Sequence, residues 1–256
     1  MTGFGAVPGS RRLTVAADAG RAARRVRALA GASDWRRELL DRIGTGLVAL
    51  VGTRPLRPTD PWPWPTRTPA AVLDGLGLPG LVLLAAAAPR QPERHRLSLL
   101  ASSGSEFLVV KLGERGDGIE TEAAALALLT ADPLPGIATP RVVAAGHLSN
   151  DPAVAFVATT ALGLERQRPA VDEPLPNFER DLAPRLAGLP RPPGAVHDVV
   201  PVHGDLAPWN LRRTSRGLAL FDWEAAGWGP PGSDLDHYRA ACATLRHRRR
   251  RAAVRA

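Results

Sequence analysis

The sequence predicts an α+β fold, in which a small antiparallel sheet is followed by a reduced and mainly helical part. Short apolar runs separated by turn residues indicate strands, and segments with apolar residues every three to four positions indicate helices. The chain has 256 residues, of which 45% are hydrophobic. This is enough to fill one large core or two smaller ones. We therefore expect an N-terminal extension followed by two parts.

The extension, residues 1–69, is predicted to be helical to about residue 55 and to end in a linker. Arg21–Ala30 and Trp35–Leu50 carry apolar residues at i, i+3 and i+4 spacing. The following segment, Arg54–Pro69, contains the run Pro-Trp-Pro-Trp-Pro, which is incompatible with a helix or a central strand. We expect it to be a linker or a packed strap.

The first of the two parts, residues 70–162, is predicted to contain three strands, one helix and two more strands. The strands of the meander are expected at Leu81–Ala85, Arg96–Leu100 and Phe107–Leu112, with a hairpin loop at residues 102–105. The helix is expected at Glu120–Leu129, and the later strands at Arg141–Ala145 and Val154–Ala158.

The second part, residues 163–256, is predicted to be mixed in character. A helix is expected at Phe178–Leu186, a strand-loop-strand unit at Val199–Trp223 and a last helix at Asp234–Arg246, followed by a basic tail. Asp234 and Asp236 open that last helix, where carboxylates suit the helix dipole. We give them a structural role, and we leave His237 and Tyr238 unassigned.

Composition limits the classes of function. The net charge of +8 comes largely from arginines in Arg21–Arg27 and Arg246–Arg255, which lack the interleaved aromatic residues that stack bases. We interpret them as solvated surface rather than a nucleic-acid site. The longest apolar stretch, Leu76–Ala88, is too short to cross a bilayer, which needs about 20 residues. The single cysteine, Cys242, excludes an intramolecular disulfide, so we expect a cytoplasmic protein.

Lys111 is the only lysine of the chain, although 33 residues are lysine or arginine. A lysine kept where arginine otherwise supplies every positive charge indicates a need for a compact ammonium group. Binding phosphate oxygens as a point charge is such a role. The alternative is that this lysine was kept by chance.

The most specific motif is His203-Gly-Asp-Leu-Ala-Pro-Trp-Asn210, followed after a short strand by Asp222-Trp-Glu224. Phosphoryl transfer needs a carboxylate that orients the acceptor hydroxyl and oxygen ligands for Mg²⁺. Asp205 and Asn210 lie five residues apart, as in the catalytic loop of protein kinases. Asp222 ends the following strand, where a second metal ligand belongs.

With His-Gly-Asp in place of His-Arg-Asp, the motif resembles that of the aminoglycoside phosphotransferase, choline-kinase and fructosamine-kinase-like group. The resemblance covers about residues 81–238. It implies a bilobal protein-kinase-like fold, with Asp205 as the catalytic carboxylate, Asn210 and Asp222 as Mg²⁺ ligands and His203 shaping the loop. It also implies that Lys111 binds the phosphates of ATP or GTP and is held by a helix glutamate, for which Glu122 is favoured over Glu120.

The function that follows is a magnesium-dependent small-molecule kinase that moves a γ-phosphate to a substrate hydroxyl. Two departures from the group leave an alternative open, a catalytically impaired binding or regulatory protein with a kinase fold. The segment Ala85–Glu93, where a phosphate-covering loop is expected, contains no glycine, and only 34 residues follow Asp222. Sugars, amino alcohols, aminoglycosides and metabolite hydroxyls all remain candidate acceptors.

Overall fold

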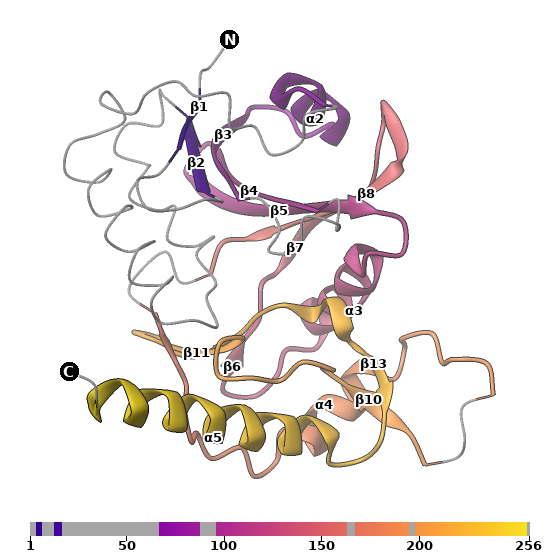
Figure 1. Ribbon diagram of the computed structural model, residues 1–256. Helices are drawn as coiled ribbons and strands as arrows, with labels where there is room; N and C mark the ends of the chain where they lie inside the picture. The colour runs from indigo at the N-terminus through magenta and orange to yellow at the C-terminus, as the bar shows by residue number, and fades with distance from the viewer. Residues whose placement is uncertain are drawn as a thin grey trace. The chain divides into compact units, whose positions relative to one another are not determined.

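The computed structural model describes residues 4–6, 13–16, 67–87, 96–162, 167–194 and 198–254. The chain divides into two compact units. The first comprises Met1–Ala123 and Val142–Leu164, and the second comprises Ala124–Arg141 and Glu165–Ala256. Helices and antiparallel strands occur together, so the predicted α+β class is confirmed (Figure 1).

The first unit is built on a seven-stranded antiparallel sheet with the order β1-β2-β3-β4-β5-β8-β7. Its strands are Phe4–Ala6 (β1), Leu13–Ala16 (β2), Leu81–Ala87 (β3), Leu97–Ser103 (β4), Glu106–Glu114 (β5), Val142–Leu148 (β7) and Asp151–Thr160 (β8). The meander of three strands and the two later strands are therefore confirmed. The predicted hairpin loop is shorter than expected, because Ser103 pairs with Glu106 and only two residues form the turn.

The alternation of side chains along β5 positions Lys111. Val110 and Leu112 are buried in the core of this unit, together with Leu97 and Leu99 of β4. Successive side chains of a strand point to opposite faces of the sheet. Lys111 therefore projects from the face opposite to Val110 and Leu112, which leaves its ammonium group available to a polar partner.

The described part of the N-terminal extension differs from the prediction. Phe4–Ala6 and Leu13–Ala16 are strands, and β2 pairs with β3, so the prediction of helix is wrong for these residues. Val15 and Ala16 are fully buried in the core of the sheet. The helices predicted at Arg21–Ala30 and Trp35–Leu50 lie outside the described residues, as does the linker before residue 67.

A short helix, α2 (Pro69–Leu76), precedes β3 and was not predicted. The hydroxyl of Thr68 accepts a hydrogen bond from the backbone N–H of Ala71, and proline stands at the first helical position, where its missing N–H costs nothing. Gly77 ends the helix in the left-handed conformation, with φ 63°.

Helix α3 (Ile119–Ala131) confirms the predicted helix and carries Glu120 and Glu122 in its first turn. The end of β5 packs closely against its start. A Cβ on Gly113 would lie 2.9 Å from the side chain of Ile119, so this strand position needs glycine. None of the described helices combines the length and apolar character that crossing a bilayer requires.

The second unit contains two small sheets. In one, β10 (Val200–Val202) pairs with β13 (Gly227–Gly229). The other has the order β6-β12-β11-β9, formed by Ile137–Ala138, Gly217–Leu220, Leu211–Thr214 and Arg168–Pro169. The unit therefore contains more strand than the mainly helical part that was predicted.

These pairings bring two connecting segments side by side. Residues 203–210 join β10 to β11, and residues 221–226 join β12 to β13. At one end Val202 pairs with Gly227, and at the other Leu211 pairs with Leu220. The two connections, which carry all the predicted catalytic and metal-binding residues of this unit, are thus tied together at both ends.

Helices α4 (Phe178–Leu186) and α5 (Ser233–Val254) complete the second unit, and both were predicted, α5 to a shorter length. Glu179 of α4 accepts hydrogen bonds from the backbone N–H groups of Gly232 and Leu235 at the start of α5. Unpaired N–H groups at a helix start need such acceptors. In Figure 1, α4 and β10 lie near this end of α5.

Candidate active site

In the first unit, Lys111 forms an ion pair with Glu122. The Nζ atom of Lys111 lies 2.8 Å from both carboxylate oxygens of Glu122, whose side chain is only 4% exposed. The other candidate, Glu120, lies 3.3 Å from His147 instead. A buried carboxylate with two contacts to one ammonium group fixes the position of that group, as a phosphate-binding lysine requires.

In the second unit, the backbone at the start of the predicted catalytic motif is held by Asp234 of α5. Its carboxylate accepts hydrogen bonds from the N–H of His203 at 2.6 Å and from the N–H of Gly204 at 2.9 Å. Asp234 is 1% exposed, and burial raises the pKa of its carboxyl group, while the two N–H groups favour the ionised form. The sequence predicted only that Asp234 opens the last helix, and it gave no sign of these two hydrogen bonds.

His203 connects the two segments through its ring. Its Nδ1 accepts a hydrogen bond from the N–H of Asp205 at 3.2 Å, and its Nε2 donates to the carbonyl of Phe221 at 3.0 Å. These partners assign the proton to Nε2 in a neutral ring. The ring is buried and packs on Trp223 with the centroids 4.5 Å apart. His203 thus orients the residue Asp205 and the carbonyl just before Asp222.

Gly204 has a physical reason to be glycine. Its φ is 81°, a conformation that L side chains rarely adopt, and a Cβ there would overlap the carbonyl oxygen of Ala225. The overlap follows from the β10–β13 pairing, which brings residues 203–204 against residues 225–226. The residue that separates His203 from Asp205 must therefore be small and conformationally free.

The side chain of Asp205 is held by the amide of Asn210. The Nδ2 group of Asn210 donates to the backbone carbonyl of Asp205 at 2.9 Å and to its Oδ2 at 2.8 Å. Because the NH₂ group makes both bonds, the carbonyl oxygen Oδ1 of Asn210 is the atom that can bind a cation. The five-residue spacing thus joins a carboxylate to a potential metal ligand.

The charge environment of Asp205 suits a base. Burial raises the pKa of its carboxyl group above the ordinary value, and the carboxylates of Asp222 and Glu224 raise it further. The hydrogen bond from Asn210 and the charge of His237 act in the opposite direction. With 37% of its side chain exposed, Asp205 remains accessible to another molecule.

Asp222 and Glu224 place two carboxylates beside this loop. Asp222 has φ 67°, an uncommon conformation that often marks a functional site, and leads into the 3₁₀ helix η2 (Trp223–Ala225). A carboxylate oxygen of Asp222 and one of Glu224 lie within 4.8 Å of each other. Sequence reasoning gave Glu224 no role, although it stands within the quoted motif.

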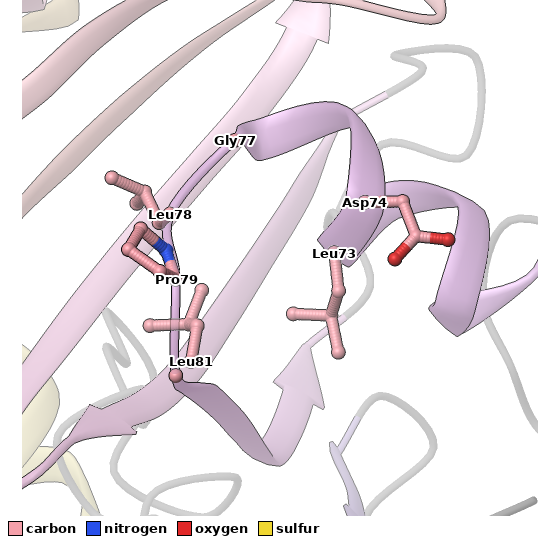
Figure 2. Close-up of a pocket in the computed structure, with 7 residues that line it drawn as sticks. Leu73, Asp74, Gly77, Leu78, Pro79 and Leu81 are labelled. Atoms are coloured by element: carbon pink, nitrogen blue, oxygen red, sulfur yellow. The ribbon is translucent and has the colours of Figure 1, made fainter.

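A hollow in the first unit lies apart from the predicted site residues. It has a volume of about 620 Å³ and is lined by Leu73, Asp74 and residues 77–81. Figure 2 shows Leu73 and Asp74 on α2, with Leu78, Pro79 and Leu81 on the segment that leads into β3. No predicted site residue lines this hollow, so we do not include it in the candidate active site.

Comparison with known protein families supports the resemblance that the sequence predicts. Residues 159–256 match the model of the phosphotransferase enzyme family. This range contains the whole motif from His203 to Glu224, and the predicted resemblance is confirmed over this part of the chain. No curated protein matches the chain.

Solved structures of kinases and phosphotransferases are similar to the chain at low identity. A thermostable mutant of aminoglycoside phosphotransferase APH(4)-Ia with ADP and hygromycin B is 11% identical, with a TM-score of 0.40 over 63% of this chain and 72% of that one. A choline/ethanolamine kinase family protein from Mesorhizobium loti is 14% identical, with a TM-score of 0.36 over 57% and 61%. Amicoumacin kinase hAmiN with AMP-PNP, Ca²⁺ and Ami is 12% identical, with a TM-score of 0.39 over 66% of both chains.

Proposed function

We propose that the chain is a small-molecule phosphotransferase, which moves the γ-phosphate of a nucleotide to a substrate hydroxyl with Asp205 as the catalytic carboxylate. The observation that carries this proposal is the arrangement of Asp205 and Asn210. A partly exposed carboxylate with a raised pKa is fixed by an amide that keeps its own carbonyl oxygen for a cation. The family match of residues 159–256 supports the same class of reaction.

The reaction forms two bonds and breaks two. The oxygen of the acceptor hydroxyl attacks the γ-phosphorus, the bond from phosphorus to the bridging oxygen breaks, and the nucleoside diphosphate leaves. The hydroxyl proton passes to the carboxylate of Asp205. A raised pKa brings this carboxylate closer to the operating pH, which is favourable for a base.

In the first unit, Lys111 binds the nucleotide phosphates. Its ammonium group is a compact charge, and the buried carboxylate of Glu122 keeps it in one position. The two roles differ: Lys111 contacts the nucleotide, and Glu122 acts by orienting Lys111. Positioning of this kind supplies much of the catalysis in phosphoryl transfer, where the protein does little covalent chemistry.

The metal ligands in this proposal are Asn210 and Asp222, with Glu224 as a further carboxylate beside them. Amide and carboxylate oxygens are the donors that Mg²⁺ prefers, so the residues fit this ion. When bound, Mg²⁺ would offset the negative charge of the phosphate groups. ATP and GTP are both compatible with these residues, and a reducing cytoplasm suits the buried free thiol of Cys242.

Thermal unfolding of the protein with and without Mg²⁺ and ATP or GTP tests the nucleotide site. A ligand at 100 times its dissociation constant stabilises the folded state by about 2.7 kcal/mol, which raises the unfolding temperature of a chain of this size by roughly 5–10 °C. We expect this rise only when Mg²⁺ is present. No rise with either nucleotide would contradict the proposal.

Variants of the ion pair make the test specific. Lys111→Ala alone leaves the carboxylate of Glu122 buried without its cation and destabilises the protein itself. The matched variant Lys111→Met with Glu122→Leu replaces both charges by apolar groups and avoids that cost. We expect the double variant to keep most of its stability and to lose the nucleotide-dependent rise. If it keeps the rise, Lys111 does not bind the phosphates.

Turnover tests the role of Asp205. Asp205→Asn keeps an acceptor for the amide of Asn210 but removes the base, so the nucleotide-dependent rise should persist while release of ADP or GDP stops. Retained turnover would exclude Asp205 as the base.

The second candidate function is nucleotide or partner binding without turnover. It is favoured by the sequence between β3 and β4, where residues 88–96 contain no glycine that would let the backbone approach a phosphate. This candidate predicts a nucleotide-dependent rise in unfolding temperature and no nucleoside diphosphate release from the native chain with any hydroxyl acceptor.

A further inference from the structure

The imidazole of His237 lies against the free edge of the Asp205 carboxylate. Its Nε2 is 3.3 Å from Oδ1 of Asp205, whereas Oδ2 of the same carboxylate accepts from Asn210 at 2.8 Å. Each oxygen of the carboxylate thus has its own nitrogen partner. Rotation of the carboxylate about its Cβ–Cγ bond would break the hydrogen bond from Asn210 and move Oδ1 away from the imidazole of His237.

The four residues between Asp205 and Asn210 supply no charged side chain for Oδ1. These residues are leucine, alanine, proline and tryptophan, none of which carries a charge. The donor comes instead from α5, three residues after Asp234. Residues three apart lie on the same face of a helix. One face of the first turn of α5 therefore contacts the loop twice. Asp234 accepts hydrogen bonds from the backbone N–H groups of the loop, and His237 contacts the carboxylate of Asp205.

Among the described residues, three further carboxylates act on Asp205 or lie close to His237. The carboxylates of Asp222 and Glu224 raise the pKa of Asp205, and the charge of His237 lowers the pKa of Asp234. His237 and the amide of Asn210 oppose this negative field at Asp205. Without His237, the carboxylate would keep one donor among several acidic groups.

We propose that His237 is a positioning residue of the phosphotransferase reaction, donating from Nε2 to Oδ1 of Asp205 so that this oxygen faces the acceptor hydroxyl. This inference rests on the proposed function. An oxygen that accepts one hydrogen bond from His237 has a second lone pair for the hydroxyl hydrogen. His237 acts through Asp205 and does not itself receive the proton.

Because His237 and Asp205 are both partly exposed, a stability measurement can distinguish a positioning role of His237 from a structural one. His237 is 48% exposed and Asp205 37%, and exposed pairs of this kind contribute little to folding stability. Removing the imidazole should therefore leave the unfolding temperature nearly unchanged. The loss should fall on kcat, because misplacing a catalytic group slows the chemical step without weakening nucleotide binding.

The kinetic test compares His237→Phe, which keeps a ring but removes the donor, with His237→Gln, whose amide can donate from a similar position. The assay follows ADP release from Mg·ATP, or GDP release from Mg·GTP, with water as acceptor. We expect His237→Phe to lower kcat about 10- to 100-fold at unchanged KM for the nucleotide, and His237→Gln to restore kcat to within about threefold of native. His247→Phe, at an exposed position of the same helix, is the control and should change neither constant.

A second measurement detects the contact without any turnover. Histidine-labelled protein gives long-range ¹H–¹⁵N correlations for its six imidazoles, and the signal of His237 is identified by its loss in His237→Gln. We expect the Nε2-protonated form in the native chain and a clear shift of this signal in Asp205→Asn. An unchanged signal would show that the contact is absent and would overturn the inference.

The outcomes distinguish the inference from the function on which it rests. An unchanged kcat in His237→Phe, with the native chain active, overturns the positioning role alone. If the contact is observed but the native chain releases no nucleoside diphosphate from either nucleotide, with water or with any hydroxyl acceptor, the proposed function fails and the positioning role fails with it. If kcat falls in His237→Phe and is not restored in His237→Gln, hydrogen-bond donation is not the property that matters.

Discussion

Substitution of Asp234 by alanine tests how the predicted catalytic loop, residues 203–210, is held. The carboxylate of Asp234 is buried and accepts from the N–H groups of His203 and Gly204. Its removal leaves the buried N–H of His203 without this acceptor, at about 1–3 kcal/mol, whereas the N–H of the exposed residue Gly204 can bind water instead. Burying the carboxylate also has a cost, which the raised pKa of Asp234 reflects. We therefore expect a net loss of about 1–2 kcal/mol, out of a typical total of about 5–15 kcal/mol.

The matched control is Asp236→Ala, two residues along the same helix turn. Asp236 is 76% exposed and pairs with Arg239 three residues later. Both substitutions remove a carboxylate from the start of α5, which is worth about 0.3–1 kcal/mol through the helix dipole. The difference between the two variants therefore isolates the hydrogen bonds to the loop.

Urea unfolding of the full chain measures both free energies. We expect equal m-values and a lower midpoint for Asp234→Ala, because the surface exposed on unfolding is the same. Amide hydrogen exchange should accelerate at residues 203 and 204 in this variant alone. If Asp234→Ala costs no more than Asp236→Ala, the buried carboxylate does not hold the loop.

Two further substitutions test local features of the site. Gly204→Ala should lower the free energy of unfolding by more than Gly116→Ala. The two glycines have similar positive φ angles, 81° and 88°, but of the two only Gly204 faces a carbonyl oxygen, that of Ala225. Equal losses of about 1–2 kcal/mol in the two variants would mean that the backbone conformation alone matters. Asp205→Asn should stabilise the protein at neutral pH. Because the folded-state pKa of Asp205 is raised, its ionisation destabilises the fold as pH rises above 3.8, so the gain should vanish below that pH, and a gain independent of pH would refute this reasoning.

Much of the sheet could be predicted because its information is local. Strands β3, β4, β5, β7 and β8 show apolar residues in short runs between turn residues, and each pairs with a strand near it in the sequence or with the next one in the meander. The N-terminal strands lacked this information. β2 pairs with β3, some 70 residues later, and a four-residue strand has no periodicity that distinguishes it from a helix segment.

Helix α2 was missed for a different reason. A rule that treats proline as a helix breaker ended the linker at Pro69, yet proline is well suited to the first position of a helix, where its missing N–H has no partner to lose. The stop signal at Gly77 and the cap at Thr68 were both present in the sequence. The prediction failed because it considered what proline does inside a helix and not what it does at the first helical position.

In the candidate site, the sequence indicated the residues to which we assign chemistry but not those that contact and support them. His203, Asp205 and Asn210 lie within one short motif, so their spacing was visible. Asp234 and His237 act on this motif from about 30 residues away, and a carboxylate at a helix start has an ordinary explanation in the helix dipole. Only the folded structure shows that these residues of α5 also contact the motif directly.

The first turn of α5 is as important to the predicted site as the motif itself. Asp234 accepts hydrogen bonds from the backbone N–H groups of His203 and Gly204, and His237 contacts Asp205. Both contacts fix residues 203–205 from a helix that begins about 30 residues later in the sequence. The conformation of the predicted catalytic segment therefore depends on α5, and substitutions at Asp234 and His237 should alter it although neither residue belongs to the motif.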